Sequence, residues 1–220
     1  MKIIGLIPIR SGSKRFPDKN VFRIKGIPLF IFSAEIAKQS GIFERIIISS
    51  DSQDYLDIAK KFGYDTHLRS KHTSHDSSTS EQVISEVISS ERLLDEDWIF
   101  LIQATNPFQK HKYFQDAKKA INSEISSVIT YRPFTRFFLE DVINKSRPRT
   151  QDMKPKELET GLFWGMNVQK FNVFKQRIIE PYAKISIREA DDVDIDYYED
   201  LECHIHRLEM IADKIDGKIK

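Results

Sequence analysis

The sequence predicts an α/β fold of the Rossmann-like, three-layer kind, with a mostly parallel central sheet. Short apolar runs alternate with helical patterns along most of the chain, which is typical of strands joined by helical crossovers. The first run, residues 2–8 (KIIGLIP), is β-prone and stops at Pro8, as expected for a parallel strand buried on both faces. A length of 220 residues suits one such domain, so we treat 1–220 as a single unit.

Helix boundaries are marked by proline and glycine. A helical pattern over residues 28–40 opens with Pro28 and is closed by Gly41, and Gly63 closes a second helix predicted from about residue 52 to 62. The other predicted elements are strands at 44–51, 98–103, 127–131, 161–168 and near Asp194, and helices over about 80–94, 112–122 and 198–215.

One stretch breaks this alternation. From Pro133 to Pro155 the residues are aromatic and basic without clear periodicity. We therefore expect residues 133–155 to form an irregular excursion from the main sheet, either a flap or a contact between subunits.

Composition excludes several classes of protein. Lys and Arg (34) nearly balance Asp and Glu (33), so bulk charge gives no reason to expect nucleic acid or a membrane surface as a partner. Any phosphate site must therefore be local. A single cysteine, Cys203, rules out an internal disulfide and fits a reducing compartment such as the cytoplasm. The apolar run at the N-terminus is too short for a signal peptide or a membrane span.

The loop after the first strand, residues 10–20, is the strongest candidate for a ligand site. Ligands of parallel sheets bind beyond the carboxyl ends of the strands. Glycine at position 12, between two serines, lets backbone N–H groups approach an anion closely. Four side chains of the loop can donate charge-assisted hydrogen bonds to phosphate: Arg10, Lys14, Arg15 and Lys19. The loop lacks the Walker order of residues, and the alternative interpretation is a solvated basic loop.

Two late carboxylates form a candidate metal site. Asp194 and Asp196 are two apart on a predicted strand, so their side chains would share a face and could hold one cation. Carboxylate and phosphate oxygens are the ligands that Mg²⁺ prefers. Without further context such a pair is more often part of a solvated turn.

The first loop also carries a resemblance to a known family. IPIRSGSKRFPDKN is similar to the IPARGGSK-x-x-P-x-KN signature of the acylneuraminate (CMP-sialic acid synthetase) cytidylyltransferase family, and differs from it at Ile9 and Ser11. Further blocks resemble the family in order across nearly the whole chain: LRS at 68–70, DSSTS at 76–80, LIQATNPF at 101–108 and DDVDIDYYEDLE at 191–202. The resemblance implies a nucleotidyltransferase version of the fold, CTP and an acidic nine-carbon sugar as substrates, Mg²⁺ as cofactor, and a homodimer.

The resemblance also assigns residues to the nucleotide phosphates. It implies that Arg10, Lys19 and Asn20 hold the triphosphate and act in catalysis with Asp194 and Asp196. The adjoining loop positions included in this assignment are Ser11, Gly12 and Lys14. The reaction implied is in-line attack by the sugar's anomeric hydroxyl on the α-phosphorus of CTP, with one of the two aspartates assisting removal of the proton.

Base and sugar contacts are implied in the same way. Arg69 and Thr79 or Ser80 would recognise cytosine, whose acceptor and donor edge differs from that of uracil. Gln103 and Thr105 would reach the sugar.

The choice of sugar depends on a later segment. RTQD at 149–152 and ETGLFWG at 159–165 look closer to the RSQD and DAGQFYWG blocks of pseudaminic acid cytidylyltransferases than to the corresponding block of N-acetylneuraminate enzymes. Arg149 would then pair with the sugar carboxylate, and Phe163 and Trp164 would face its acylamino or deoxy carbon. The alternative is that these aromatic residues belong to the core.

Other functions stay open at this point. A cytidylyltransferase for an eight-carbon ulosonic acid shares the fold and the metal chemistry, although its first loop usually has a Lys-Pro pair where this chain has Lys19-Asn20. A glycosyltransferase would leave the basic loop without a role, and a non-catalytic nucleotide-binding homologue would retain the fold without turnover. Four histidines show no partner in the sequence: His67, His72, His75 and His111.

Overall fold

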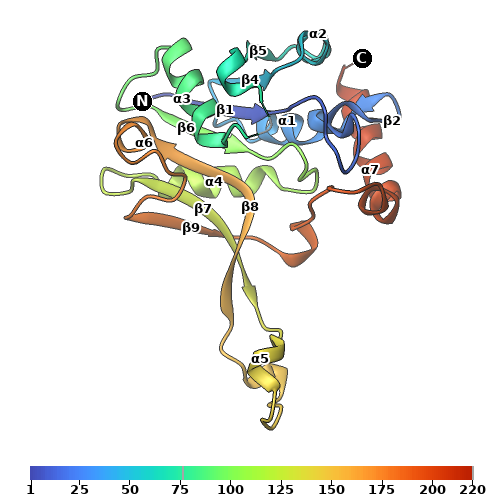
Figure 1. Cartoon of the computed structure of the whole chain (residues 1–220), viewed down its shortest axis with the longest axis vertical. Coiled ribbons are helices and arrows are strands. Elements are labelled where there is room, and N and C mark those ends of the chain that lie inside the picture. Colours follow the sequence, from blue (N-terminus) through green and yellow to red (C-terminus); the bar gives the residue numbers. More distant parts are fainter. Residues whose placement is uncertain (76, 220) are drawn as a thin grey trace.

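A seven-stranded sheet forms the centre of the computed structural model, which describes residues 1–75 and 77–219 (Figure 1). The strand order is β5-β4-β1-β6-β8-β7-β9, and β8 alone runs antiparallel to its neighbours. The prediction of a mostly parallel sheet is therefore confirmed. The strands are β1 (Ile3–Pro8), β4 (Arg45–Ser50), β5 (Asp65–Leu68), β6 (Trp98–Ile102), β7 (Ser127–Phe134), β8 (Lys156–Asn167) and β9 (Tyr182–Ser186).

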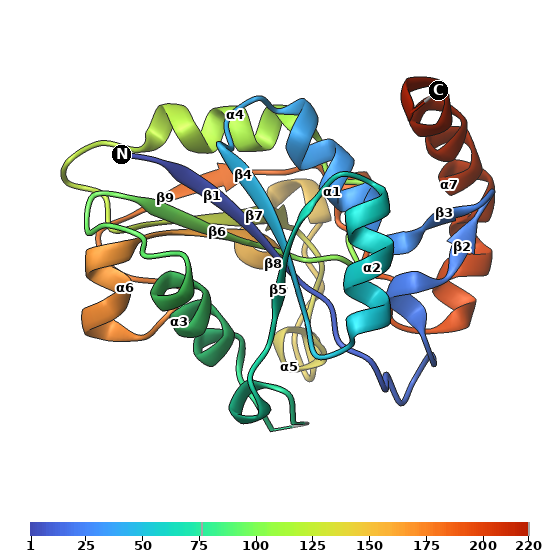
Figure 2. The ribbon, with the colours of Figure 1, turned by 90° about the horizontal axis from the view of Figure 1, so that it is seen from above.

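Helices cover both faces of the sheet, as Figure 2 shows. One face carries α1 (Leu29–Gln39), α2 (Gln53–Lys61), α4 (His111–Ala120) and α7 (Tyr198–Ile219). The other face carries α3 (Ser80–Ser90) and α6 (Val168–Phe174). A two-stranded ribbon of β2 (Arg23–Ile24) and β3 (Ile27–Pro28) lies at the edge near α7. None of the helices in the described part of the chain has the length and hydropathy that a membrane crossing requires.

The first strand shows how the sequence fills both layers. Successive side chains of a strand point to opposite faces, and β1 buries Ile3 and Ile7 in the core under α1 while Ile4 and Leu6 enter the core under α3. All four are at most 4% exposed. The unbroken apolar run is therefore explained by burial on two faces.

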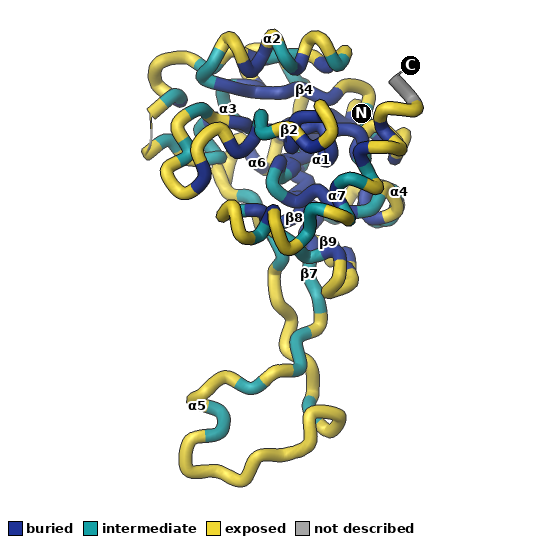
Figure 3. The backbone as a smooth tube through the Cα atoms, turned by 90° about the vertical axis from the view of Figure 1, so that its right-hand side faces the viewer, coloured by how far each residue is buried: buried dark blue, intermediate teal, exposed yellow. Residues whose placement is uncertain are grey.

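Strands β7 and β8 continue beyond the sheet as a long arm (Figure 1). Residues 135–155 form its tip, which contains the short helix α5 (Leu139–Val142) and is mostly exposed (Figure 3). The excursion predicted at residues 133–155 corresponds to this arm. The prediction was possible because the composition and periodicity of these residues do not suit a packed element.

Several expected elements differ from the structure. The strand predicted near Asp194 is wrong, since residues 192–196 have no regular secondary structure. Strand β8 begins at Lys156, before the predicted start, and α3 ends at Ser90 instead of continuing to residue 94. Strands β5 and β9 and helix α6 were not predicted from the sequence; they are short elements of at most seven residues.

A buried carboxylate fixes the segment between β9 and α7. Asp191 has no exposed surface and accepts hydrogen bonds from Tyr113 Oη (2.8 Å), Arg188 Nε (2.9 Å) and Arg207 Nη2 (3.0 Å). Burial alone would raise the pKa of Asp191, but the hydrogen bonds from Arg188 and Tyr113 and the positive charge of Lys110 hold this pKa below its ordinary value. This cluster joins α4 and α7 to the segment that continues to Asp194.

We predict that Asp191→Asn lowers the free energy of unfolding at pH 7 by about 1.5–3 kcal/mol, because charge-assisted hydrogen bonds are lost. The pKa of Asp191 is lower in the folded protein than in the unfolded chain, where it is about 3.9. The ionised carboxylate therefore stabilises the fold fully above about pH 3.9, and this stabilisation is lost as the pH falls through the folded-state pKa. The difference between wild type and variant should therefore shrink below about pH 4 in urea titrations.

Asp213→Asn is the matched control, since Asp213 forms an exposed ion pair with Lys25. It should leave stability almost unchanged. Equal stability of wild type and Asp191→Asn at pH 7, or a difference that persists in acid, would contradict the assignment.

Candidate active site

A cleft of about 650 Å³ opens at the carboxyl ends of β1, β5 and β6. Most of the predicted site residues lie on its wall: Arg10, Lys14, Lys19, Asn20, Arg69, Thr79, Ser80, Gln103, Thr105, Asp194 and Asp196. The first loop and the late aspartates therefore face one shared cavity. This is the arrangement that the proposed nucleotide site requires.

An aromatic side chain anchors the first loop. Phe16 is buried between Phe22 and Tyr198, with ring centroids 5.4 and 5.6 Å away. After it, Asp18 takes a left-handed conformation (φ 53°), which aspartate tolerates better than most residues, and a short 3₁₀ turn follows. This turn buries Lys19 and Asn20 and presents both to the cleft.

Two polar contacts close the base of the loop. Asn20 Nδ2 donates a hydrogen bond to the carbonyl oxygen of Arg10 (3.3 Å). Asp51, at the end of β4, accepts from the backbone N–H of Ser11 (2.8 Å) and from its hydroxyl (2.7 Å). Burial opposes ionisation of Asp51, yet these bonds from Ser11 hold its pKa below the ordinary value. The loop is thus held by a charged acceptor at the end of β4, while the neighbouring Ser52 caps α2.

The late aspartates are placed by the residue between them. Ile195 is fully buried, and its backbone N–H donates to the carbonyl oxygen of Thr105 (2.9 Å). With Ile195 in the core, Asp194 and Asp196 both line the cleft. The predicted strand is wrong, although the two carboxylates line the same cleft.

Asp196 is held by two cations of the first loop. Lys19 Nζ lies 2.7 Å from Oδ1 and Arg15 Nη1 lies 2.7 Å from Oδ2. Arg15 also stacks over the ring of Tyr197 (5.4 Å). Desolvation raises the pKa of Asp194, and the nearby charge of Asp196 adds to the rise, against the hydrogen bond with Thr105 and the positive charge of Lys19. The two carboxylates therefore have different partners in the same cleft.

Arg69 and the start of α3 also line the cleft. The guanidinium group of Arg69 is half-buried and bonded to the ends of β1 and β4 through Ile9 and Ser49. Thr79 accepts a hydrogen bond from the backbone of Gln82 and so caps α3 beside the cleft. The first residue of the related DSSTS block, Asp76, lies outside the described residues.

Five predicted site residues do not line the cleft. Ser11 and Gly12 are in the loop behind it, where Ser11 binds Asp51. Arg149 lies near the tip of the arm and pairs with Asp152 (2.7 Å). Phe163 has no exposed surface and stacks on Phe114 (centroids 4.5 Å apart), so its predicted contact with a sugar is contradicted. Trp164 is also buried and packs under Arg177 on the other face of the sheet.

Arg15, predicted from the sequence as a phosphate donor, also lines the cleft. Three further polar residues line it that were not assigned to it from the sequence: Ser13, His75 and Ser78. Ser13 belongs to the cationic loop, so the composition of that loop was the available signal. His75 and Ser78 lie between the short 3₁₀ helix at Lys71–Thr73 and α3, and only the folded chain brings this segment over the cleft.

The donor atoms in the cleft fit a hard divalent cation shared with phosphate. Asp194 and Asp196 are the acidic residues among its described lining. Within residues 1–75 and 77–219 no group of three or more His, Cys, Asp or Glu side chains has metal-binding geometry. A cation here would take two protein ligands and complete its shell with phosphate and water oxygens, which is the binding pattern of Mg²⁺.

Comparisons with known proteins agree with this geometry. Pseudaminic acid cytidylyltransferase of Campylobacter jejuni (serotype O:2) is 28% identical over 220 residues, covering 92% of this chain and 94% of that protein. A Helicobacter pylori protein named as pseudaminic acid cytidylyltransferase and UDP-2,4-diacetamido-2,4,6-trideoxy-β-L-altropyranose hydrolase is 29% identical across 88% of this chain. The N-acylneuraminate cytidylyltransferase of Escherichia coli O18:K1:H7 is 29% identical across 78% of it.

The chain spans only 40% of the Helicobacter protein and 38% of the Escherichia enzyme. Among solved structures, a CMP:2-keto-3-deoxy-manno-octonic acid synthetase complexed with CTP has the same fold, with a TM-score of 0.72, 13% identity and coverage of 96% of this chain and 99% of that one. A family model described as cytidylyltransferase matches residues 4–156. Because this match takes in well over half of the 220 residues, the chain belongs to the cytidylyltransferase family.

Proposed function

We propose that the protein transfers CMP from CTP to the anomeric hydroxyl of a nonulosonic acid, giving a CMP-sugar and pyrophosphate. The observation that carries the proposal is the single cleft in which the cationic first loop faces Asp194 and Asp196. A basic loop alone, or an aspartate pair alone, would have simpler explanations. A metal-bound triphosphate needs both in one cleft, the cations for its phosphate oxygens and the carboxylates for its metal.

The first loop would bind the triphosphate. Arg10, Lys14 and Asn20 line the cleft beside Lys19, and all four can donate to phosphate oxygens. Lys19 and Arg15 pair with Asp196 in the structure, so both cations are already beside the carboxylates. Phosphate oxygens entering here would compete with Asp196 for these donors.

Asp194 and Asp196 would hold Mg²⁺ together with phosphate oxygens. The bound cation would offset the negative charge that develops on the α-phosphoryl group and on the leaving pyrophosphate. The sugar hydroxyl attacks the α-phosphorus in line, the bond to the pyrophosphate oxygen breaks, and the hydroxyl proton is lost to Asp194 or Asp196 or to water. Positioning and electrostatic stabilisation supply most of the catalysis in phosphoryl and nucleotidyl transfer.

Base and sugar would lie on either side of the phosphates. Arg69 with Thr79 or Ser80 lines the cleft and suits the cytosine edge, and Gln103 and Thr105, which also line it, suit the sugar. The relatives described above act, by name, on pseudaminic and N-acylneuraminic acids, which favours a nine-carbon acid of the sialic type, with pseudaminic or legionaminic acid as the specific candidates. Arg149 lies near the tip of the arm, so it could pair with the sugar carboxylate only if this tip reached a substrate-binding cleft.

The first test is turnover with CTP, Mg²⁺ and a panel of nonulosonic and octulosonic acids, followed by mass spectrometry of CMP-sugars and by pyrophosphate release. We expect product with a nine-carbon acid. Product from the octulosonic acid alone would establish the alternative substrate, and no pyrophosphate with any sugar would favour a non-catalytic homologue.

The same assay tests the aspartates. Asp194→Asn and Asp196→Asn should each reduce kcat on the order of 100-fold at saturating Mg²⁺, because charge stabilisation is lost at the reacting phosphate. Glu199→Gln, at the exposed start of α7, removes a neighbouring charge outside the cleft and should retain wild-type turnover. Near-wild-type turnover in both aspartate variants would remove these residues from the mechanism.

We also propose that the arm joins two copies of the chain in a homodimer. Its tip exposes large parts of three apolar side chains, with Phe138 44%, Leu139 75% and Ile143 52% exposed. Packing such residues against a second copy would remove them from water.

Light scattering after gel filtration tests this proposal. We expect a dimer for the wild type and a monomer for the double variant Leu139→Glu with Ile143→Glu. Met210→Glu, which alters an exposed apolar residue on α7, should remain dimeric. A monomeric wild type, or a dimer that survives both changes in the arm, would rule out this interface.

A further inference from the structure

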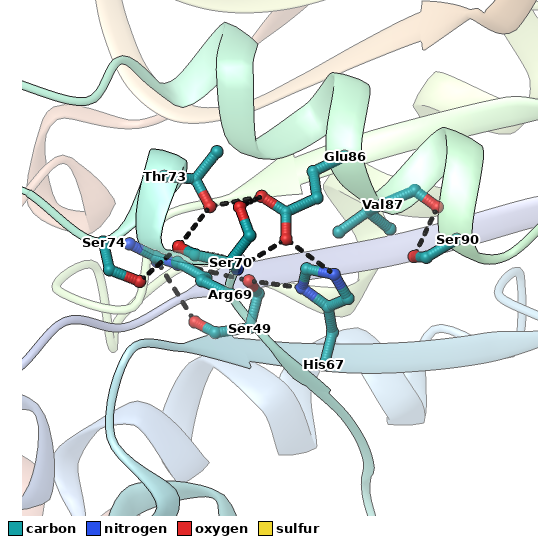
Figure 4. Close-up of polar contacts among 9 residues, drawn as sticks. All are labelled: Ser49, His67, Arg69, Ser70, Thr73, Ser74, Glu86, Val87 and Ser90. Atoms are coloured by element: carbon teal, nitrogen blue, oxygen red, sulfur yellow. Dashed lines mark hydrogen bonds and ion pairs between the residues drawn. The ribbon is translucent and has the colours of Figure 1, made fainter.

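A chain of polar contacts lies behind Arg69, on the wall of the cleft (Figure 4). Arg69 Nε donates to Ser49 Oγ (3.2 Å), while Nη2 donates to the carbonyl oxygens of Ser49 (3.1 Å) and Ile9 (3.4 Å). The two Nη1 donors have no hydrogen-bond partner among the described residues. Arg69 therefore offers the cleft one end of a guanidinium whose other end is fixed.

The next link is a buried histidine. His67, on β5, is 8% exposed, and its Nδ1 lies 3.0 Å from Ser49 Oγ. Its Nε2 lies 3.6 Å from Glu86 Oε1 on α3. His67 thus stands between an acidic side chain and the serine that contacts Arg69.

Glu86 determines which groups donate and which accept in this series of polar contacts. Its carboxylate accepts hydrogen bonds from the backbone N–H of Ser70 (2.7 Å), from the hydroxyl of Ser70 (3.1 Å) and from Thr73 Oγ1. Burial alone would raise the pKa of Glu86, but the bonds from Thr73 and Ser70 hold this pKa below its ordinary value. An ionised Glu86 accepts only, so it favours the histidine tautomer that carries its proton on Nε2.

That tautomer orders the remaining contacts. With the proton on Nε2, His67 Nδ1 is an acceptor and receives the hydroxyl proton of Ser49. Ser49 Oγ then directs a lone pair to Arg69 Nε–H. Burial lowers the pKa of His67, which keeps the ring neutral and avoids a second positive charge beside Arg69.

We propose that His67, acting through Ser49, is a positioning residue that fixes the orientation of Arg69 and thereby sets nucleobase selectivity in the cleft. The inference rests on the proposed function, because it assumes that Arg69 faces the base of the nucleotide. A donor held in one orientation discriminates cytosine from uracil, whereas a mobile guanidinium can adapt to either edge.

The test compares binding of CTP and UTP in the presence of Mg²⁺, measured by calorimetry without any sugar. Ser49→Ala removes the link to Arg69 with little change of volume, and His67→Leu fills the space without an acceptor. Both should reduce the preference for CTP over UTP by about 10-fold, as expected for loss of one hydrogen bond to a charged group. His67→Asn places an amide oxygen where Nδ1 stood and should recover most of the preference.

Ser90→Ala is the matched control, because Ser90 lies on α3 one turn beyond Glu86 and its hydroxyl donates to the carbonyl oxygen of Val87 in the same helix (Figure 4). It should keep the wild-type preference. Thermal unfolding of each variant checks that the fold is intact. A merely structural role for His67 would weaken binding of both nucleotides alike and would give no selective rescue by asparagine.

Two results separate this inference from the proposed function. A wild type that binds neither nucleotide overturns both. A wild type that prefers CTP, with folded Ser49→Ala and His67→Leu proteins that keep the same preference, overturns the positioning role of His67 and leaves the proposed function standing.

Discussion

The ion pair between Lys19 and Asp196 joins two segments 177 residues apart and defines the cleft. Lys19 is held by the 3₁₀ turn behind Phe16, and Asp196 is held by the buried Ile195 beside it. The Lys19 side chain is only 8% exposed, so removal of Asp196 would leave a buried charge uncompensated. Asp196 is 28% exposed and would keep Arg15 as a second partner if Lys19 were removed. A metal-bound triphosphate would satisfy both sides, supplying anions to the lysine and a cation to the aspartate.

Around this pair, residues that do not line the cleft hold in place the charged groups that do. Asp51 holds the backbone at Ser11, and Asp191 fixes the chain before Asp194. Arg69 is braced in the same manner by Ser49, which His67 contacts in turn. In each case a side chain of the sheet or of a neighbouring helix fixes a loop residue, and loops at the ends of strands are where an α/β sheet places its ligands.

The sequence predicted the layers, the mostly parallel sheet and the arm, because proline, glycine and hydrophobic periodicity act locally. The resemblance of the blocks that contain them also assigned Arg10, Lys19, Asp194 and Asp196 to one site. The strand at Asp194 was mispredicted because an alternating pattern also arises when one buried residue, Ile195, anchors a loop. Phe163 is buried because its face of β8 meets the core, and Arg149 is far from the cleft because the arm is long. Local sequence patterns predict neither the face of β8 that is buried nor the length of the arm.

A crystal structure of the protein with CTP and Mg²⁺ tests the central claim most directly. We expect the triphosphate against Arg10 and Lys19, and the metal bound to Asp194 and Asp196 together with a phosphate oxygen. A nucleotide bound elsewhere, or a triphosphate in this cleft with its metal away from both aspartates, would contradict the account.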